Sequence, residues 1–512
     1  MKLKITALLL AVFCMMLALM QTNCNPKNAD EKTVKDVTPV PLPTNIVPGF
    51  HFPEDSAIIY KWISNNSFPG SYDSASIYKH AWGIWAGLTA QSGEVYGGDP
   101  LLVYQTWLGK SELKDLIEHD SLGCEGATRK FGISPFERPK QLEHGFAFSK
   151  RNFAMLAAIP GKSAPARENF ANFWVTVSYN PGAACFATTN KIYKASVINT
   201  YYNAGGLGAI PVFPSNSITV KPAYLVFDDT DSLFKLPVWK TAPNPASASF
   251  NIFSNPDSMQ YVYIDKNNKQ PANKVAVPVN NTENNAALIK AATVNLSDFI
   301  SLKIDKKMAE YMNMEQDSIS QINAIAGQIA VLVGMHVTSK EISNWTWQSY
   351  YWTPTPNTPG LPSCDLAASL RPKEITGAAA HYACVTAYVM LTPNNAPNNT
   401  PGAGPIFGYN PYLEGSFGPG VFGFKNTYNA SYQYGVQSNC MSCHALAIAD
   451  TNSVVNVAAQ YTTDQTIDLR GSYFKNQVSV DFAWSVQSAF IRDTIPYWDP
   501  QYGKKAMPPK MK

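Results

Sequence analysis

The pattern of apolar residues predicts both helices and strands in the first half of the chain. Between residues 76 and 88 apolar positions recur at helical spacing, which predicts an amphipathic helix. The positions on its apolar face are Ile77, Ala81, Ile84, Trp85 and Leu88. Residues 101–108 and 217–227 are rich in β-branched and aromatic side chains and predict strands. Because proline cannot donate to a β-ladder, we expect Pro222 to place the second strand at an edge or at a bulge.

The second half of the chain also predicts both helices and strands. Residues 283–311 carry charges on one side of a helical pattern, and residues 369–391 also predict a helix. Residues 329–335 and 345–352 predict two strands, and a further helix is expected at 480–491. These elements predict an α+β fold with a large body that is rich in strands and loops, followed by a C-terminal segment.

The first residues have the pattern of an export signal. Lys2 and Lys4 precede an apolar stretch at 5–20, which is shorter than the ~20 residues of a membrane-spanning helix. Cys24 follows this stretch, as in bacterial lipoproteins whose cysteine carries the lipid anchor, although the three residues before it depart from the usual pattern. Lipidation at Cys24, plain secretion and a retained anchor helix all remain open. We expect a signal peptide at 1–23 and a location in the cell envelope, either periplasmic or anchored to the outer membrane.

The rest of the chain divides into three predicted parts. Residues 24–52 are polar and contain Pro39, Pro41, Pro43 and Pro48, which is typical of an extended tether. The β-rich body is expected at 53–400 and the C-terminal segment at 401–512. The apolar stretch at 319–337 contains several polar residues, so we expect it to be a buried element and not a second membrane span.

Composition narrows the classes of partner. The 512 residues carry a net charge of +3, and charged residues make up 15% of the chain, against a typical ~25%. There is no run of Lys and Arg to contact phosphates, which argues against nucleic acid as the main partner. The 45% hydrophobic content favours a well-buried, aromatic-rich protein outside the cytoplasm.

Four cysteines in the body could form disulfides in an oxidising compartment. Proximity in the sequence favours the pairs 364–384 and 124–185, although four cysteines allow three sets of pairings. Free, buried cysteines are the alternative.

The motif with the clearest chemistry is C-x-x-C-H at Cys440, Cys443 and His444. Two thiols at this spacing can add to the two vinyl groups of one haem, and the adjacent imidazole can then bind the iron. From the cysteine and histidine frequencies, chance would produce this pattern about 0.002 times in the chain. A redox dithiol or a zinc site is the alternative, but no second Cys/His pair follows nearby. We therefore predict one covalently attached c-type haem with His444 as the proximal iron ligand.

The sixth iron ligand decides what such a haem can do. A second strong ligand suits electron transfer, whereas an open position permits binding or catalysis. His336 is one candidate for this ligand, and Met507 and His381 are alternatives. For all three, a structural role without iron is the competing interpretation.

Several phrases of the sequence together resemble a family of exported bacterial monohaem cytochrome-c-like proteins. They lie at residues 80–89, 104–107, 217–224, 332–337, 345–347 and 438–445. The resemblance implies a haem buried in a large β-rich body. The family usually continues its Trp-x-Trp phrase with a Phe-Glu-His-like stretch, where this chain has Gln348-Ser349-Tyr350-Tyr351. The histidine of that stretch is therefore absent here and cannot be the iron ligand.

These observations predict haem binding and electron transfer in the cell envelope, with a redox protein as partner and a possible lipid anchor in the membrane. The alternatives are a haem enzyme of the peroxidase or oxygenase type and a haem-based sensor, each with an open iron position. The body is much larger than the ~100 residues that a simple electron carrier needs, which favours these alternatives. The sequence alone does not identify a substrate.

Overall fold

The computed structural model describes residues 36–63, 73–119, 127, 173–238, 260–271, 274–280, 285–314, 324–360, 362–388, 410–413, 440–449, 474–488, 497–498 and 505–506. The predicted signal peptide at 1–23, Cys24 and Met507 lie outside these residues. The described part has an α+β fold, as predicted, with several antiparallel sheets. Within it, no helix combines the length and apolar character that a bilayer crossing requires.

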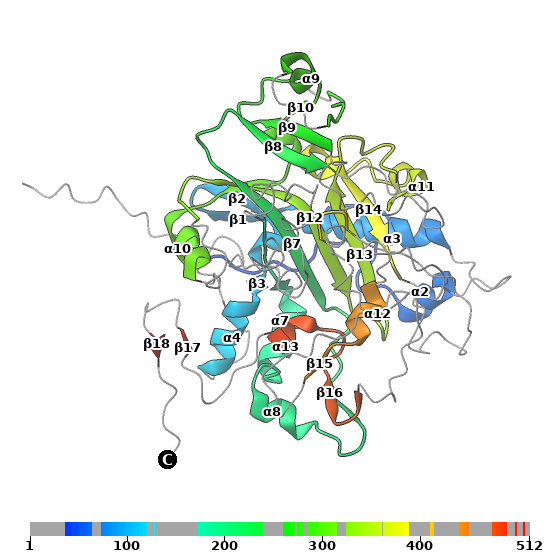
Figure 1. Ribbon diagram of the computed structural model, residues 1–512. Helices are drawn as coiled ribbons and strands as arrows, with labels where there is room; N and C mark the ends of the chain where they lie inside the picture. Colours follow the sequence, from blue (N-terminus) through cyan, green and yellow to red (C-terminus); the bar gives the residue numbers. More distant parts are fainter. Residues whose placement is uncertain are drawn as a thin grey trace, which may run out of the picture.

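The largest sheet has eight strands and occupies the centre of the molecule (Figure 1). Its main path runs in the order β14-β13-β12-β7-β5-β3, while β11 pairs with β12 and β4 pairs with β7, and all of these pairs are antiparallel. The strands are β3 (Leu108–Gly109), β4 (Phe173–Val175), β5 (Ser178–Tyr179), β7 (Ile218–Phe227), β11 (Ser301–Lys303), β12 (Ile329–Ser339), β13 (Thr346–Trp352) and β14 (Tyr382–Thr386). The three strands predicted at 217–227, 329–335 and 345–352 are confirmed as β7, β12 and β13.

Pro222 does not lie at an edge, because β7 is a central strand. On one side β7 pairs with β12, opposite Met335, and the register of this pair shifts between Leu332 and Gly334. On its other side the partner is broken into β4 and β5, and the Pro222 carbonyl accepts a hydrogen bond from Thr176 N in the gap between them. The expectation of an edge was wrong, whereas the alternative of a bulge agrees with the shifted register beside the proline.

The predicted helix at 76–88 is confirmed as α3 (Ser74–Leu88), and all five predicted apolar positions are buried. The Asp73 side chain begins the helix by accepting a hydrogen bond from Ser76 N at 3.1 Å. Gly83 permits close packing, because a Cβ there would lie 2.1 Å from the Phe50 ring. The Trp85 ring stacks on Tyr350 of β13 with 4.3 Å between centroids. The helix therefore covers one face of the central sheet.

The predicted strand at 101–108 is only partly correct. The chain forms β2 (Asp99–Leu102), then the 3-10 helix η1 (Val103–Thr106), and then β3. The Gln105 side chain accepts a hydrogen bond from Leu102 N at 2.8 Å, and the Thr106 hydroxyl donates to Val103 O at 2.7 Å. These local side-chain bonds compete with the extended conformation.

The predicted helix at 283–311 is only partly confirmed, because the region is helical at its two ends and not in its middle. The region contains α9 (Ala286–Ala291), β10 (Thr293–Asn295), η5 (Leu296–Asp298), β11 and α10 (Lys306–Met314). The three residues of β10 are buried and pair in parallel with β9 (Gln260–Asp265). Pairing with a distant strand thus overrides the local helical pattern.

The predicted helix at 369–391 was largely wrong, whereas the one at 480–491 is partly confirmed. The first region holds only the end of α11 (Asp365–Ser369), then η6 (Gly377–His381) and the buried strand β14, which pairs with β13. In the second region the helix α13 (Trp484–Ser488) begins four residues later than predicted, because Asp481 and Phe482 have positive φ values of 50° and 67°, which are not helical. Residues 389–391 and 489–491 lie outside the described residues.

Smaller elements surround the central sheet (Figure 1). They are the helices α2 (Ser56–Ile63), α4 (Lys110–Glu118), α7 (Pro181–Thr189), α8 (Ala195–Thr200) and α12 (Cys440–Ala445), and the strands β1 (Gln91–Tyr96), β6 (Leu207–Ala209), β8 (Leu233–Val238), β15 (Ile448–Ala449), β16 (Gln477–Ser479), β17 (Tyr497–Trp498) and β18 (Lys505–Ala506). Strand β16 pairs with β15 and with β6, so the C-terminal segment shares a sheet with the body.

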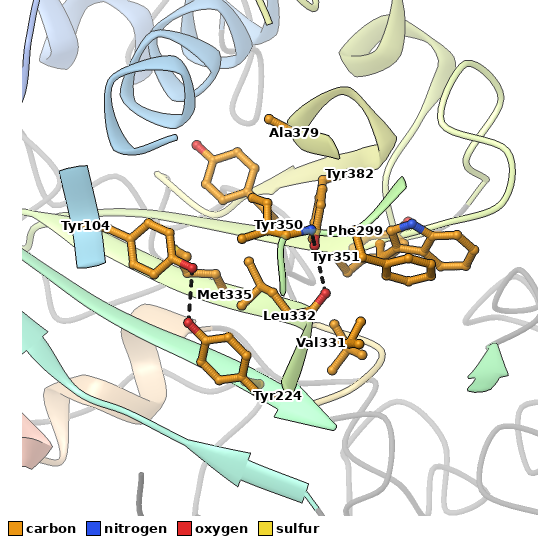
Figure 2. Close-up of a cluster of buried hydrophobic side chains, with 14 of the residues drawn as sticks. Tyr104, Tyr224, Phe299, Val331, Leu332, Met335, Tyr350, Tyr351, Ala379 and Tyr382 are labelled. Atoms are coloured by element: carbon orange, nitrogen blue, oxygen red, sulfur yellow. Dashed lines mark hydrogen bonds between the residues drawn. The ribbon is translucent and has the colours of Figure 1, made fainter. Parts of the chain in front are cut away.

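Two buried apolar clusters lie against the sheet. The larger joins α3 to the long strands, and Figure 2 shows several of its tyrosines, whose rings are buried. Tyr104 and Tyr224 bond to each other at 3.0 Å, and Tyr382 donates to Leu332 O at 2.7 Å. The second cluster includes Trp347 and parts of α7, α12 and α13, which lie at one end of the long strands (Figure 1).

Removal of the Tyr382 hydroxyl group tests most directly how the larger cluster stabilises the fold. It donates to Leu332 O and accepts from Ile300 N at 3.3 Å in a fully buried position. Tyr382→Phe leaves both backbone groups without this partner, so we expect a loss of about 1–3 kcal/mol in unfolding free energy, measured by urea denaturation. The same change at Tyr202, which is 40% exposed, is the control. Equal stability of the two variants would contradict this role.

Candidate functional site

The C-x-x-C-H motif forms the short helix α12, which packs into the second apolar cluster. Cys440 begins the helix and is half-buried. Cys443 follows three residues later in the same helix, and its side chain is outside the described part of the structure. Met441 and Ala445 are buried in the cluster and hold α12 against the body.

The imidazole of His444 has a defined tautomer. Its Nδ1 lies 2.8 Å from the carbonyl oxygen of Phe482. Because a carbonyl oxygen can only accept, Nδ1 carries the proton and donates it in this bond. In the neutral ring the lone pair then belongs to Nε2, the nitrogen on the opposite side of the ring from this bond. This arrangement is the one that prepares a histidine to bind a metal ion.

Trp347 of β13 forms the wall beside this imidazole. The two ring centroids are 4.3 Å apart, with an interplanar angle of 47°. The indole is itself fixed, since its Nε1 donates to Asn344 O at 2.9 Å and the residue is only 4% exposed. The sheet therefore sets the position of His444 on one side, and the Phe482 carbonyl sets it on the other.

His336 projects from the same face of the sheet. It lies opposite Ser349 in the β12–β13 ladder, and its neighbour Thr338 lies opposite Trp347. Since alternate residues of a strand share a face, His336 and Trp347 are on one side of the sheet. The His336 Nδ1 is 2.9 Å from Ser349 Oγ, which also accepts a hydrogen bond from Asn410 Nδ2 at 2.9 Å.

Glycine at position 334 makes room for this polar group. A Cβ at Gly334 would lie 2.7 Å from the side chain of Asn410, so a larger residue would displace the amide. Asn410 also donates to the Tyr350 carbonyl at 2.8 Å and is fully buried. The contacts of Ser349 and Asn410 therefore hold the His336 ring in one orientation.

Burial and charge keep His444 neutral. Burial lowers its pKa to about 3; the hydrogen bond to Phe482 O raises it, while His336 and Lys221 lower it further. Lys221 lies opposite His336 in the β12–β7 ladder. A neutral imidazole at physiological pH has its lone pair available for a metal ion without losing a proton.

The other histidine predicted as a ligand lies elsewhere. His381 Nε2 is 3.7 Å from Asp298 Oδ1, and burial lowers the pKa of His381. His381 directly precedes Tyr382, which pairs with Trp352 at the far end of β13 from Trp347. Five residues of strand span about 17 Å. The structure thus places His336 on the sheet face of Trp347, whose ring lies against His444, and leaves His381 apart. Met507 is outside the described residues.

One predicted disulfide was wrong. Cys364 and Cys384 are both free. The Cys364 sulfur caps α11 by accepting from Ala367 N at 3.4 Å and lies 3.5 Å from the Tyr78 hydroxyl, which explains its orientation. Cys185 is disulfide-bonded, and Cys124, its predicted partner, lies outside the described residues.

Sequence reasoning missed the residues that hold the site in place. Asp481 and Phe482 sit in a loop with positive φ, and Lys340 pairs with Asp481 at 2.6 Å. A lysine and an aspartate 141 positions apart carry no local signal of a pair. The Trp-x-Trp phrase at 345–347 was the one visible hint, since it places Trp347 next to His444.

No protein-family model, no curated protein and no solved structure matches the chain. Among the described residues, no group of three or more His, Cys, Asp or Glu side chains is placed to hold a metal ion.

The lowered pKa of His444 predicts a pH dependence for the polypeptide without any bound group. Its folded pKa of about 3 lies below the unfolded value of about 6.5. Between these values the unfolded chain binds more protons, so folding stability rises with pH through this window and is lost as the pH falls. Replacing His444 with Gln removes this contribution.

We expect wild type to lose about 2–3 kcal/mol more stability than His444→Gln between about pH 7.5 and about pH 4.5. Urea denaturation of protein made in the cytoplasm without residues 1–23 measures this difference. Equal losses in the two proteins would contradict a neutral, buried His444.

Proposed function

We propose that the chain carries one covalently attached c-type haem at Cys440, Cys443 and His444 and transfers electrons in the cell envelope. The observation that supports this most strongly is the hydrogen bond from His444 Nδ1 to Phe482 O, because it leaves the Nε2 lone pair for iron. The haem iron, when bound, supplies a one-electron couple. A redox protein is the proposed partner.

The residues around the motif fit such a group. Cys440 is half-buried, and its spacing to Cys443 suits thioether bonds to two vinyl groups. Trp347, Met441, Leu446 and Ile448 give the surroundings an apolar character that excludes water. Such burial is one of the means by which a protein tunes the potential of an iron centre.

His336 is the proposed sixth ligand. It shares the sheet face with Trp347, whose ring lies 4.3 Å from the His444 ring between centroids, and it contributes to the lowered pKa of His444. The contact with Ser349 Oγ fixes its Nδ1 side, which directs Nε2 away from Ser349. Two imidazoles, each fixed by a contact at its Nδ1, suit a low-spin iron that transfers electrons without binding a substrate.

The polar group of Ser349 and Asn410 supports a second candidate function. Hydrogen-bonding groups beside an open iron position favour the binding or activation of small molecules. If His336 stays unligated, the chain is a haem enzyme or a haem-based sensor. The two functions differ in the ligand state of the iron, which can be measured.

The intact mass of protein exported from a host with working cytochrome maturation tests the covalent attachment of haem. We expect the intact mass of wild type to exceed that of its polypeptide by one haem, and the Cys440→Ser and Cys443→Ser variants to lose thioether bonds. Cys364→Ser, at a free cysteine outside the motif, is the matched control and should retain the haem. A wild-type mass equal to the bare polypeptide, allowing for signal removal and any lipid at Cys24, would overturn the proposal.

The optical spectrum tests the role of His336. We expect a low-spin spectrum that carbon monoxide leaves unchanged in wild type, and a high-spin, carbon-monoxide-binding iron in His336→Ala. The matched control His381→Ala should keep the wild-type spectrum. Carbon monoxide binding by the wild type would favour the enzyme or sensor instead, and an unchanged spectrum in His336→Ala would exclude this histidine as the ligand.

A further inference from the structure

The carbonyl that accepts the His444 hydrogen bond belongs to a backbone in an unfavourable conformation. Asp481 has φ 50° and Phe482 has φ 67°. Positive φ is tolerated by aspartate, but it is rare and costly for a bulky aromatic residue. Such a conformation persists only where surrounding contacts enforce it, and it is often found where a group must be held in place for function.

The side chain of Asp481 supplies the contacts that enforce this backbone conformation. Its Oδ1 lies 2.6 Å from the Lys340 ammonium, and its Oδ2 accepts a hydrogen bond from Phe213 N at 3.1 Å. Both carboxylate oxygens are therefore occupied, and the side chain is 11% exposed. Next to it, Ala483 N donates to Val480 O at 3.0 Å and closes the turn.

Lys340 is anchored in turn to the sheet. It follows β12 directly, its backbone N donates to Ser217 O at 3.0 Å, and its ammonium also donates to Ser343 O at 2.6 Å. The ammonium lies 5.3 Å from the centroid of the Trp345 ring, and the side chain is 4% exposed. A charge buried this deeply requires its partner, so the ion pair with Asp481 is not an optional surface contact.

These contacts form one path from the sheet to the iron-binding nitrogen. Lys340 holds Asp481, Asp481 holds the loop, and the loop presents the Phe482 carbonyl to His444 Nδ1 at 2.8 Å. A firmly placed acceptor at Nδ1 makes Nε2 a stronger electron donor. A stronger donor favours the ferric over the ferrous state and so lowers the reduction potential.

We propose that Lys340 and Asp481 are positioning residues that set the donor strength of His444 and thereby the reduction potential of the centre. This inference rests on the proposed function, since it concerns the haem bound through His444. Neither residue contacts the iron. The buried ion pair would thus adjust the reduction potential of the iron without binding it.

The test is a redox titration of haem-loaded protein, compared at equal haem content. In Lys340→Met and in Asp481→Asn we expect the reduction equilibrium to shift about tenfold toward the ferrous form, an upward change of about 59 mV for one electron. Lys340→Arg keeps the charge and the hydrogen-bond donors, so we expect its reduction potential to lie close to that of wild type. Lys303→Met, at a lysine whose side chain is 63% exposed, is the matched control and should leave the potential unchanged.

The double variant separates the ion pair from general destabilisation. If the two residues act through each other, Lys340→Met combined with Asp481→Asn shifts the potential no further than either change alone. Additive shifts, or wild-type potentials in both single variants, would overturn the inference while leaving the proposed function intact. If Lys340→Met fails to fold, Asp481→Asn, which keeps the size of the side chain, decides the question alone. Wild type without any attached haem would instead overturn the proposed function itself.

Discussion

Two neighbouring buried charges in the turn after β12 constrain the rest of the structure. Lys340 and Glu341 are 5% and 2% exposed. A buried ion without a partner costs several kcal/mol, so each must be paired. Lys340 pairs with Asp481 of the C-terminal segment, whereas the Glu341 carboxylate accepts from Glu54 N at 2.7 Å and lies 3.0 Å from the His80 ring of α3. One turn thereby ties the first helices, the sheet and the C-terminal segment together.

Strand β13 divides the core from the candidate site. On one face Tyr350 stacks on Trp85 of α3, which makes that face part of the larger apolar cluster. On the other face Trp347 lies against His444, and Ser349 lies against His336. Because successive side chains of a strand point to opposite faces, the packing that fixes Tyr350 also fixes its neighbours on the site side. The site is thus built on a rigid element, as precise placement of a metal ligand requires.

The sequence predicted those elements whose local pattern agreed with their tertiary surroundings. Helix α3 and strands β7, β12 and β13 are long and strongly patterned, and they were predicted correctly. The predicted helix at 283–311 is interrupted because β10 pairs with β9, and the one at 369–391 failed because β14 pairs with β13. Such pairings are decided by distant strands and leave no trace in a local window.

The candidate site also contains some residues that the sequence predicts and others that it does not. The C-x-x-C-H motif is local, so Cys440 and His444 could be singled out from spacing and chemistry alone. The Phe482 carbonyl and the Lys340–Asp481 pair could not, because a backbone oxygen has no sequence signal and the partners are far apart in the chain. His336 was identifiable as a candidate, but its place on the sheet face of Trp347 follows from the β12–β13 register and not from its neighbours in the sequence.

The most direct test of the central claim is to locate iron in crystals of the exported protein by anomalous scattering at the iron edge. We expect one iron per chain, bound to His444 Nε2 on the side of the ring away from Phe482 O and next to Trp347. Iron bound at another part of the chain, or crystals of exported protein without iron, would contradict the account.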